Sequence, residues 1–268
     1  MGLTITKAHA YGNDFLFVPE AEVQSDPVAL ARALCARHTG VGADGLILYT
    51  VRQAGATMRL WNADGSPSEL SGNGLRCLAA LVAREQRLDP MVPARATVAI
   101  GTTAGLKTLD LLAVEGARYT FRAAMGAPTD LRQAVITVAG EAVPVVRLGV
   151  GNPQCIVLGP LPDETRFRAI GGALAVHPAF PDGTNVEFVA VEAPDRIRIL
   201  IWERGVGPTT SSGTGSSASA VAAAAFGGAE RSVDVVAPGG TQRVEWRDDG
   251  IYLTGDAEML VTGVWLPN

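Results

Sequence analysis

The chain carries one short pattern twice: Ser71-Gly72-Asn73-Gly74 and, slightly more than half the chain later, Ser212-Gly213-Thr214-Gly215. Each copy leads into an Ala-rich segment of helical character, at 75–85 and at 216–226. Self-similarity at a period of about half the chain indicates two related domains. We therefore expect two domains, each of them a sheet wrapped around a central helix.

Length and composition agree with two folded domains. The chain has 268 residues, of which 47% are apolar, and domains of about 150 residues are the common size. This apolar content, with no Gly-X-Y repeat, excludes disorder and collagen. The net charge of −5 supplies no broad positive field, so we expect no nucleic-acid or membrane partner. A small-molecule enzyme or binding protein remains.

The chain has three cysteines, Cys35, Cys77 and Cys155, with no CxxC spacing. An odd number without such spacing argues against a disulfide framework and against a thiolate metal site. The first 18 residues lack a basic and then apolar leader, and the apolar stretch 218–229 is too short for a membrane span. These features predict a soluble protein of the reducing cytoplasm that binds no metal.

Segments with strand character outnumber those with helical character, which predicts an α+β fold of mostly antiparallel sheets. The clearest further helix is 26–38, where Asp26 is a capping residue and Pro27 fits the first helical position. Glycine and proline at 125–128 predict a boundary between domains 1–124 and 125–259, with a last strand, 260–268, returning to the first domain. Strands are expected at 3–8, 15–18, 45–51, 57–61, 97–100, 106–114, 119–123, 142–149, 155–158, 185–191, 196–202, 232–236, 241–246 and 251–254.

The two Ser-Gly-x-Gly stretches also predict chemistry. A serine N-cap followed by glycines leaves backbone N–H groups open to a ligand, and the helix dipole favours negative charge there. Each copy is therefore a candidate cradle for a carboxylate. Two such helix starts, aimed at one ligand from opposite sides, suit the inversion of a carbon centre, where one group removes a proton and another returns one to the opposite face.

Many ordered motifs along the whole chain resemble diaminopimelate epimerase, a cofactor-independent family of amino-acid epimerases. The resemblance implies two mirror-related domains with the substrate in the cleft between them, no cofactor, and a role in making lysine and peptidoglycan precursors. A homodimer is compatible with it. The motifs are Gly12-Asn13-Asp14, residues 40–45, Asn62-Ala63-Asp64-Gly65, Gly72-Asn73-Gly74, residues 125–128, Gly151-Asn152-Pro153, residues 185–188, residues 203–207, Gly213-Thr214-Gly215 and Pro238-Gly239-Gly240.

The resemblance also implies site residues. The positions expected to hold the carboxylates and amines of diaminopimelate are Asn13, Asn62, Asn152, Asn185 and Arg204, and the amides expected to cradle the reacting carboxylate are those of Gly72, Asn73, Gly213 and Thr214. The chemistry agrees, since an α-proton is weakly acidic and its removal needs donors where negative charge develops. Arginine adds a two-pronged donor for the distal carboxylate.

The sequence departs from the family where the acid and base are expected. The family has a cysteine before each Gly-x-Gly, whereas this chain has Ser71 and Ser212. A thiol is readily ionised at a helix N-terminus, but a serine hydroxyl needs a neighbouring base. Gln154 stands where the family has a histidine, Pro208 where it usually has a glutamate and Ser217 where a cysteine is common, while Glu203 is retained as a candidate base for Ser212.

These changes leave three functions open. The first is epimerisation of diaminopimelate between its LL and meso forms, with Ser71, Ser212 and Glu203 as catalytic residues. The second is a different isomerisation or a dehydration of a related amino or carboxylic acid. The third is an amino-acid binder without catalysis. Deuterium exchange at the α-carbon separates them, because only an epimerase incorporates solvent deuterium into both stereoisomers.

Overall fold

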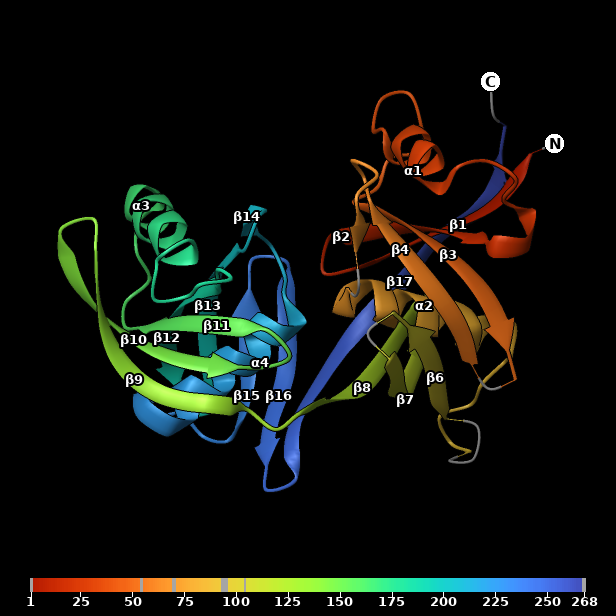
Figure 1. The fold of residues 1–268 in the computed structure, drawn as a ribbon. Coiled ribbons are helices and arrows are strands. Elements are labelled where there is room, and N and C mark those ends of the chain that lie inside the picture. The colour runs from red at the N-terminus through yellow and green to blue at the C-terminus, as the bar shows by residue number, and fades with distance from the viewer. Residues whose placement is uncertain (1, 54, 69–70, 93–95, 104, 267–268) are drawn as a thin grey trace. The chain divides into compact units, whose positions relative to one another are not determined.

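A computed structural model describes residues 2–53, 55–68, 71–92, 96–103 and 105–266 (Figure 1). The fold is rich in strands and has few helices. The chain divides into one unit of Met1–Ala123 with Gly255–Asn268 and a second unit of Ala124–Thr254. None of the helices in the described part of the chain is long and apolar enough to span a membrane.

The elements of the first half begin before the division at residue 123, and the last of them, β8, crosses it. They are β1 Leu3–Ala10, β2 Asn13–Pro19, the 3-10 turn η1 Glu20–Glu22, α1 Pro27–Cys35, β3 Gly45–Arg52, β4 Gly55–Asn62, β5 Pro67–Ser68, α2 Gly72–Glu85, β6 Thr97–Thr102, β7 Gly105–Glu115 and β8 Arg118–Gly126.

The elements of the second half follow in a similar order. They are β9 Thr129–Val138, β10 Glu141–Gly149, β11 Pro153–Leu158, α3 Glu164–Ala175, β12 Asn185–Ala193, β13 Arg196–Glu203, β14 Gly207–Thr209, α4 Gly213–Ala222, the π turn η3 Ala223–Gly227, β15 Ser232–Ala237, β16 Gly240–Arg247 and β17 Gly250–Trp265.

Among the pairings for which the structure gives a register, each unit contains two parallel pairs, and a helix lies between the two strands of every such pair. In the first unit α1 connects β2 to β3 and α2 connects β4 to β6. In the second unit α3 connects β11 to β12 and α4 connects β13 to β15. Parallel neighbours need such a crossover, whereas the remaining neighbours, such as β3 with β4 and β12 with β13, are antiparallel. The order of pairings is the same in both units.

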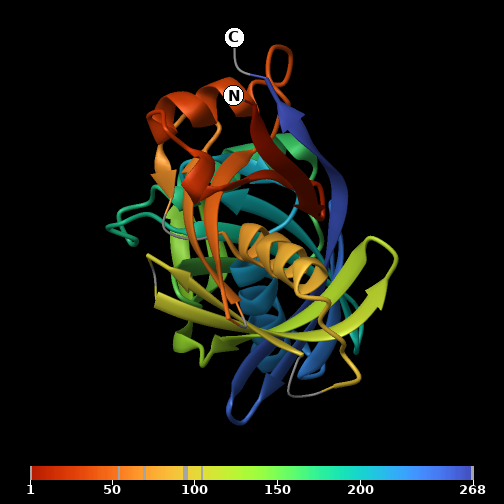
Figure 2. The ribbon, with the colours of Figure 1, turned by 90° about the vertical axis from the view of Figure 1, so that its right-hand side faces the viewer.

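Strand alternation divides each sheet into two apolar faces. On β2, Phe15 and Phe17 lie in the core around α2, whereas Leu16 and Val18 lie in the core beneath α1. α2 is buried at every position from 73 to 83, as expected for a helix that is apolar on all sides (Figure 2). α4 is buried in the same way in the second unit, where its Ala, Ser and Gly residues allow the strands to approach closely.

The predicted elements agree with the structure in part. The helix expected at 26–38 is α1, with the Asp26 side chain accepting from Val28 N and Ala29 N, but it ends at Cys35. The helix expected at 216–226 begins at Gly213 and changes to the π turn after Ala222. All three cysteines are buried and free.

The sequence interpretation missed α3 and β9, as well as the short elements η1, β5 and β14. α3 contains two adjacent glycines that weaken its helical pattern, yet Asp163 caps it by accepting from Arg166 N at 2.8 Å. β9 lacks a clear apolar alternation because most of its side chains are at least partly exposed, and it forms through its pairing with β10. β17 is also longer than expected, because it runs without interruption from Gly250 to Trp265.

Candidate functional site

Ser71 begins α2 as its N-cap. Its Oγ accepts from the backbone N–H of Gly74 at 3.1 Å, and its carbonyl accepts from Leu75 N at 2.8 Å. A Cβ built on Gly72 would have no atom within 4 Å, so the first turn of this helix has an open side. The first N–H groups of a helix have no partner within the helix, which makes this open start suited to an anion.

Asn13 and Asn73 lie together beside this helix start. Asn73 Nδ2 donates to Asn13 Oδ1 at 3.3 Å, and Asn13 Nδ2 donates to Asp44 Oδ2 at 2.8 Å. The buried guanidinium of Arg76 donates to Asn73 Oδ1 at 3.3 Å. The structure therefore joins two predicted site residues in one network and adds Asp44 and Arg76, which the sequence interpretation did not include.

Asn62 lies on a separate turn between β4 and β5. Its Nδ2 donates to Ser66 Oγ at 2.9 Å and its backbone N–H to Ser66 O at 2.8 Å. The side chain is exposed. Within the described residues, no hydrogen bond joins it to Asn13 or Asn73, so its role as a ligand remains a prediction.

Ser212 is the N-cap of α4 and repeats the geometry of Ser71. Its Oγ accepts from Gly215 N at 3.0 Å and lies 3.4 Å from Thr214 Oγ1. This helix start is more crowded, because a Cβ at Gly213 would lie 3.0 Å from Leu253 Cδ2. A side chain at position 213 would therefore require Leu253 to move by a few tenths of an ångström.

Asn185 and Arg204 are joined where β12 begins and β13 ends in the second unit's sheet. Asn185 Oδ1 accepts from the backbone N–H of Arg204 at 2.9 Å, which fixes the direction of the Asn185 amide. The Arg204 side chain is exposed and donates from Nη1 to Asp182 O at 2.6 Å. This contact holds one end of the guanidinium in place. The other N–H groups of the side chain can then form two parallel hydrogen bonds with a carboxylate.

Gln154 brings the remaining amides of this unit together. Its side-chain amide lies 2.6 Å from Asn152 Oδ1, 3.2 Å from Asn185 Nδ2 and 3.3 Å from Thr214 Oγ1. The register explains this meeting, because Gln154 pairs with Asn185 where β11 and β12 run parallel. Asn152, Asn185 and Thr214, all predicted from the resemblance, therefore surround Gln154.

Two carboxyl groups lie in the same region. Burial raises the pKa of Glu203, which ends β13, and this favours its neutral form. Burial, and secondarily the charge of Glu203, raises the pKa of Glu187 well above its usual 4.5. Glu187 is completely buried, and the sequence interpretation gave it no role. The sequence did contain a signal for Glu187, which is an acidic residue inside the largely apolar run 185–189. A carboxyl buried in such a strand needs a specific partner, which would have indicated a role.

The cysteines do not supply the acid or base that the serines lack. Cys77 and Cys155 are fully buried in the apolar cores. Burial raises the pKa of the Cys77 thiol to about 12 and raises that of Cys155 as well. Both remain uncharged near neutral pH, which confirms that they are core residues.

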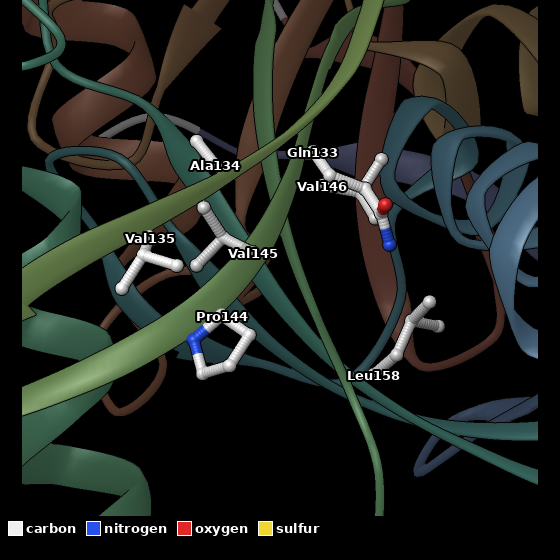
Figure 3. A pocket seen from close by; sticks show the side chains of 7 residues that line it. All are labelled: Gln133, Ala134, Val135, Pro144, Val145, Val146 and Leu158. Atoms are coloured by element: carbon white, nitrogen blue, oxygen red, sulfur yellow. The ribbon is translucent and has the colours of Figure 1, made fainter.

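A hollow of about 350 Å³ lies away from these groups, on β9, β10 and the end of β11 (Figure 3). Its lining is mainly apolar and includes Val135, Pro144, Val145 and Leu158. None of the predicted site residues lines this hollow. The two helix starts therefore remain the candidate functional positions, with donors for a carboxylate in each unit and the Glu187 carboxyl at the start of α4 beside Ser212.

Comparisons with known proteins identify relatives along nearly the whole chain. The profile of the family "Diaminopimelate epimerase" matches residues 5–130 and 146–260. The diaminopimelate epimerase of Desulforudis audaxviator is 42% identical over 98% of this chain and 99% of its own length. The diaminopimelate epimerase of Desulfitobacterium hafniense is 39% identical over 98% of both chains.

Solved structures share the fold at low sequence identity. A predicted epimerase from Pseudomonas aeruginosa has a TM-score of 0.71 at 14% identity, covering 99% of this chain and 100% of its own. A hydroxyproline epimerase from Agrobacterium vitis has a TM-score of 0.67 at 16% identity, covering 98% of this chain and 90% of its own. Both likenesses concern the fold alone.

Proposed function

Because the chain belongs to the diaminopimelate epimerase family, we propose that it interconverts LL- and meso-diaminopimelate by removing and returning the proton at one α-carbon. It is an isomerase, and its place is in amino-acid biosynthesis. The repeated helix start is the observation that supports placing the reaction at this site. Ser71 caps α2 and Ser212 caps α4, and the Oγ of each serine accepts from the backbone N–H three residues later.

We further propose that the two units are related domains and that both helix starts act on one substrate. The same order of strand pairings in each unit supports the first part. The chemistry supports the second part, because inversion at a carbon needs a proton acceptor on one face and a donor on the other. In this proposal the N–H groups of Gly72, Asn73, Gly213 and Thr214 hold the carboxylate next to the reacting carbon.

Ser71 and Ser212 take the places of the proton acceptor and donor in this proposal. A serine hydroxyl holds its proton more tightly than a thiol, whose usual pKa is about 8.5. Glu203, whose pKa is raised by burial, is the candidate group for exchanging a proton with Ser212. Asn13, Asn62, Asn152, Asn185 and Arg204 supply the polar contacts to the rest of the substrate. No cofactor takes part.

Deuterium incorporation tests the proposal. The purified protein, incubated with LL- or meso-diaminopimelate in deuterium oxide, is expected to place deuterium at the α-carbon of both isomers, as mass spectrometry or proton NMR will show. The Ser71→Cys/Ser212→Cys variant is expected to react faster by about 10²-fold or more, the size of a typical acid–base contribution. Glu203→Gln is expected to slow the wild-type reaction.

The control is Ser216→Ala, which removes a buried hydroxyl from α4 outside the proposed site. Exchange into a single isomer would indicate a one-base reaction and contradict epimerisation. Binding of diaminopimelate without any exchange, in both the wild-type protein and the thiol variant, would show that the chain is a binder.

A further inference from the structure

Glu187 is a buried carboxyl to which the proposed reaction gives no role. It lies in the middle of β12, between Val186 and Phe188, which pack into the core beneath α3. Because side chains alternate along a strand, Glu187 lies on the opposite face, which is the one that packs against α4. Its carboxyl is fully buried, so its position depends entirely on the few groups that touch it.

The carboxyl touches the start of α4 beside Ser212. A Cβ built on Gly215 would collide with Glu187 Oε1 and would lie 3.1 Å from Ser212 Oγ. In the described part of the first unit, the atoms nearest to the corresponding position are apolar. There, a Cβ on the corresponding Gly74 would meet Ile47 Cδ1 at 3.0 Å and Phe15 Cε1 at 3.4 Å. The two helix starts therefore differ in what lies behind them, an apolar pair in one unit and a carboxyl in the other.

Gln154 connects this carboxyl to the helix start, and its orientation can be assigned. One end of its amide lies 3.1 Å from both carboxyl oxygens of Glu187, and the other end lies 3.2 Å from Asn185 Nδ2. Asn185 cannot turn its oxygen towards Gln154, because that oxygen accepts from Arg204 N. The end of Gln154 that faces Asn185 is therefore the oxygen, and its NH₂ donates to Glu187. The same oxygen lies 2.6 Å from the Asn152 amide, so Asn152 must turn its own NH₂ towards Gln154 and donate to it.

This orientation gives the hydrogen bonds at Ser212 a direction. Thr214 Oγ1 lies 3.3 Å from the oxygen of Gln154, which can only accept, so Thr214 donates to it. A hydroxyl has one proton, and Thr214 can then only accept from Ser212, whose Oγ lies 3.4 Å away. Ser212 Oγ accepts from Gly215 N at the same time. Its proton is thus donated in a hydrogen bond to Thr214, which leaves one lone pair of Oγ to face the substrate. When Oγ takes up the substrate proton, its own proton passes to Glu203, the exchange partner in the proposed function.

We propose that Glu187 is a positioning residue for Ser212. By accepting from the Gln154 NH₂, it holds the Gln154 amide with its oxygen towards Thr214. Thr214 then donates to Gln154 and accepts a hydrogen bond from Ser212. The inference rests on the proposed function, because the direction of the Ser212 hydroxyl matters only if Ser212 exchanges a proton with the substrate. It also assigns different tasks to the two serines, because Ser71 has no carboxyl and amide pair of this kind behind it.

The surroundings of Glu187 define how it responds to pH. The groups facing it are Gln154 on β11, Glu203 on β13 and the start of α4, while the Cys155 thiol lies on the neighbouring strand. Glu203 is the titratable neighbour among them, and a negative charge on it adds to the effect of burial in raising the pKa of Glu187. Both forms of a carboxyl accept a hydrogen bond, but the ionised form accepts more strongly.

Nitrogen-15 NMR of the Gln154 side chain tests the contact without any need for activity. The Nε2 signal, identified by its loss in Gln154→Leu, is expected to shift with pH in the wild-type protein as Glu187 titrates. In Glu187→Gln the contact remains but the titration is removed, so the signal is expected to stay constant. A wild-type signal that ignores pH, or an unchanged pH response in Glu187→Gln, would overturn the proposal.

Deuterium exchange into diaminopimelate tests the effect on Ser212. Glu187→Leu removes the acceptor and is expected to lower kcat about tenfold with little change in KM, the size of one lost hydrogen bond. Glu187→Gln is expected to restore most of the rate while flattening its pH profile. Ser216→Ala, one position beyond Gly215 on α4, is the matched control and is expected to keep the wild-type rate.

The two measurements separate this inference from the proposed function. A normal NMR response together with no exchange in the wild-type protein would contradict epimerisation and would leave the Glu187–Gln154 contact established. If Glu187→Leu, shown to be folded by near-UV circular dichroism, exchanged deuterium as fast as Ser216→Ala, Glu187 would have no positioning role.

Discussion

At the scale of single residues, Ser71 and Ser212 show how one motif acquires two chemical environments. Both side chains accept from the third N–H of their own helix, at 3.1 Å and 3.0 Å. Behind Ser71 the sheet presents Phe15 and Ile47, and behind Ser212 it presents Gln154 and Glu187. The local motif is therefore equivalent in the two units, and its neighbours decide which serine has groups that accept or hold protons.

The raised pKa of Glu187 predicts how stability depends on pH. A carboxyl whose pKa is higher in the folded than in the unfolded protein binds more protons when folded. Its contribution to stability is complete below the usual 4.5 and is lost as the pH rises through the raised value. The free energy of unfolding, measured by urea titration at several pH values, is therefore expected to fall with rising pH. The fall is expected to be steeper in the wild-type protein than in Glu187→Gln. Equal slopes for the two proteins would contradict the prediction.

At the scale of elements, the glycines of the two helix starts are not equivalent. Gly72→Ala adds a methyl group where nothing lies within 4 Å, and we expect it to change the free energy of unfolding by at most about 0.5 kcal/mol. Gly215→Ala forces the methyl group against the buried Glu187 carboxyl, and we expect a loss of about 1–3 kcal/mol. Urea unfolding of the two variants measures the difference, and a mild effect at position 215 would show that Glu187 moves freely.

Helices in this protein depend on the sheet to different degrees. α1 has its own start signals, Asp26 and Pro27, and the structure confirms both. α3 has a cap in Asp163 but two glycines inside, and it is held by apolar packing of Phe167, Ile170 and Leu174 against β12 and β13. Elements with strong local signals were predictable, whereas α3 and β9 form because tertiary contacts outweigh weak local preference.

At the scale of the whole molecule, β17 belongs to both units. It pairs with β16 through residues 250–254, and with β1 from Glu258 to Trp265. Removing residues 260–268 takes away the partners of Leu3 to Lys7 in β1. Hydrogen exchange of β1 amides is expected to become at least about tenfold faster, because their hydrogen bonds open locally.

The second unit provides the internal control for this truncation. β15 and β16 pair with each other through Ser232–Glu245 to Ala237–Gly240, and none of these contacts involves the removed residues. Their amides are expected to keep their protection. Faster exchange in β15 and β16 as well would indicate that the two units unfold together rather than separately.

The sequence by itself determined the family and the repeated helix starts, and it predicted the ligand positions, because these depend on residue types at fixed spacing. Only the tertiary structure showed that Glu187 stands behind Ser212 while Ile47 stands behind Ser71. Strand register decides that contrast, since it selects which side chain of a buried strand faces the helix start. No local pattern in a single chain records that choice, and the hydrogen-bond direction at Ser212 follows from it.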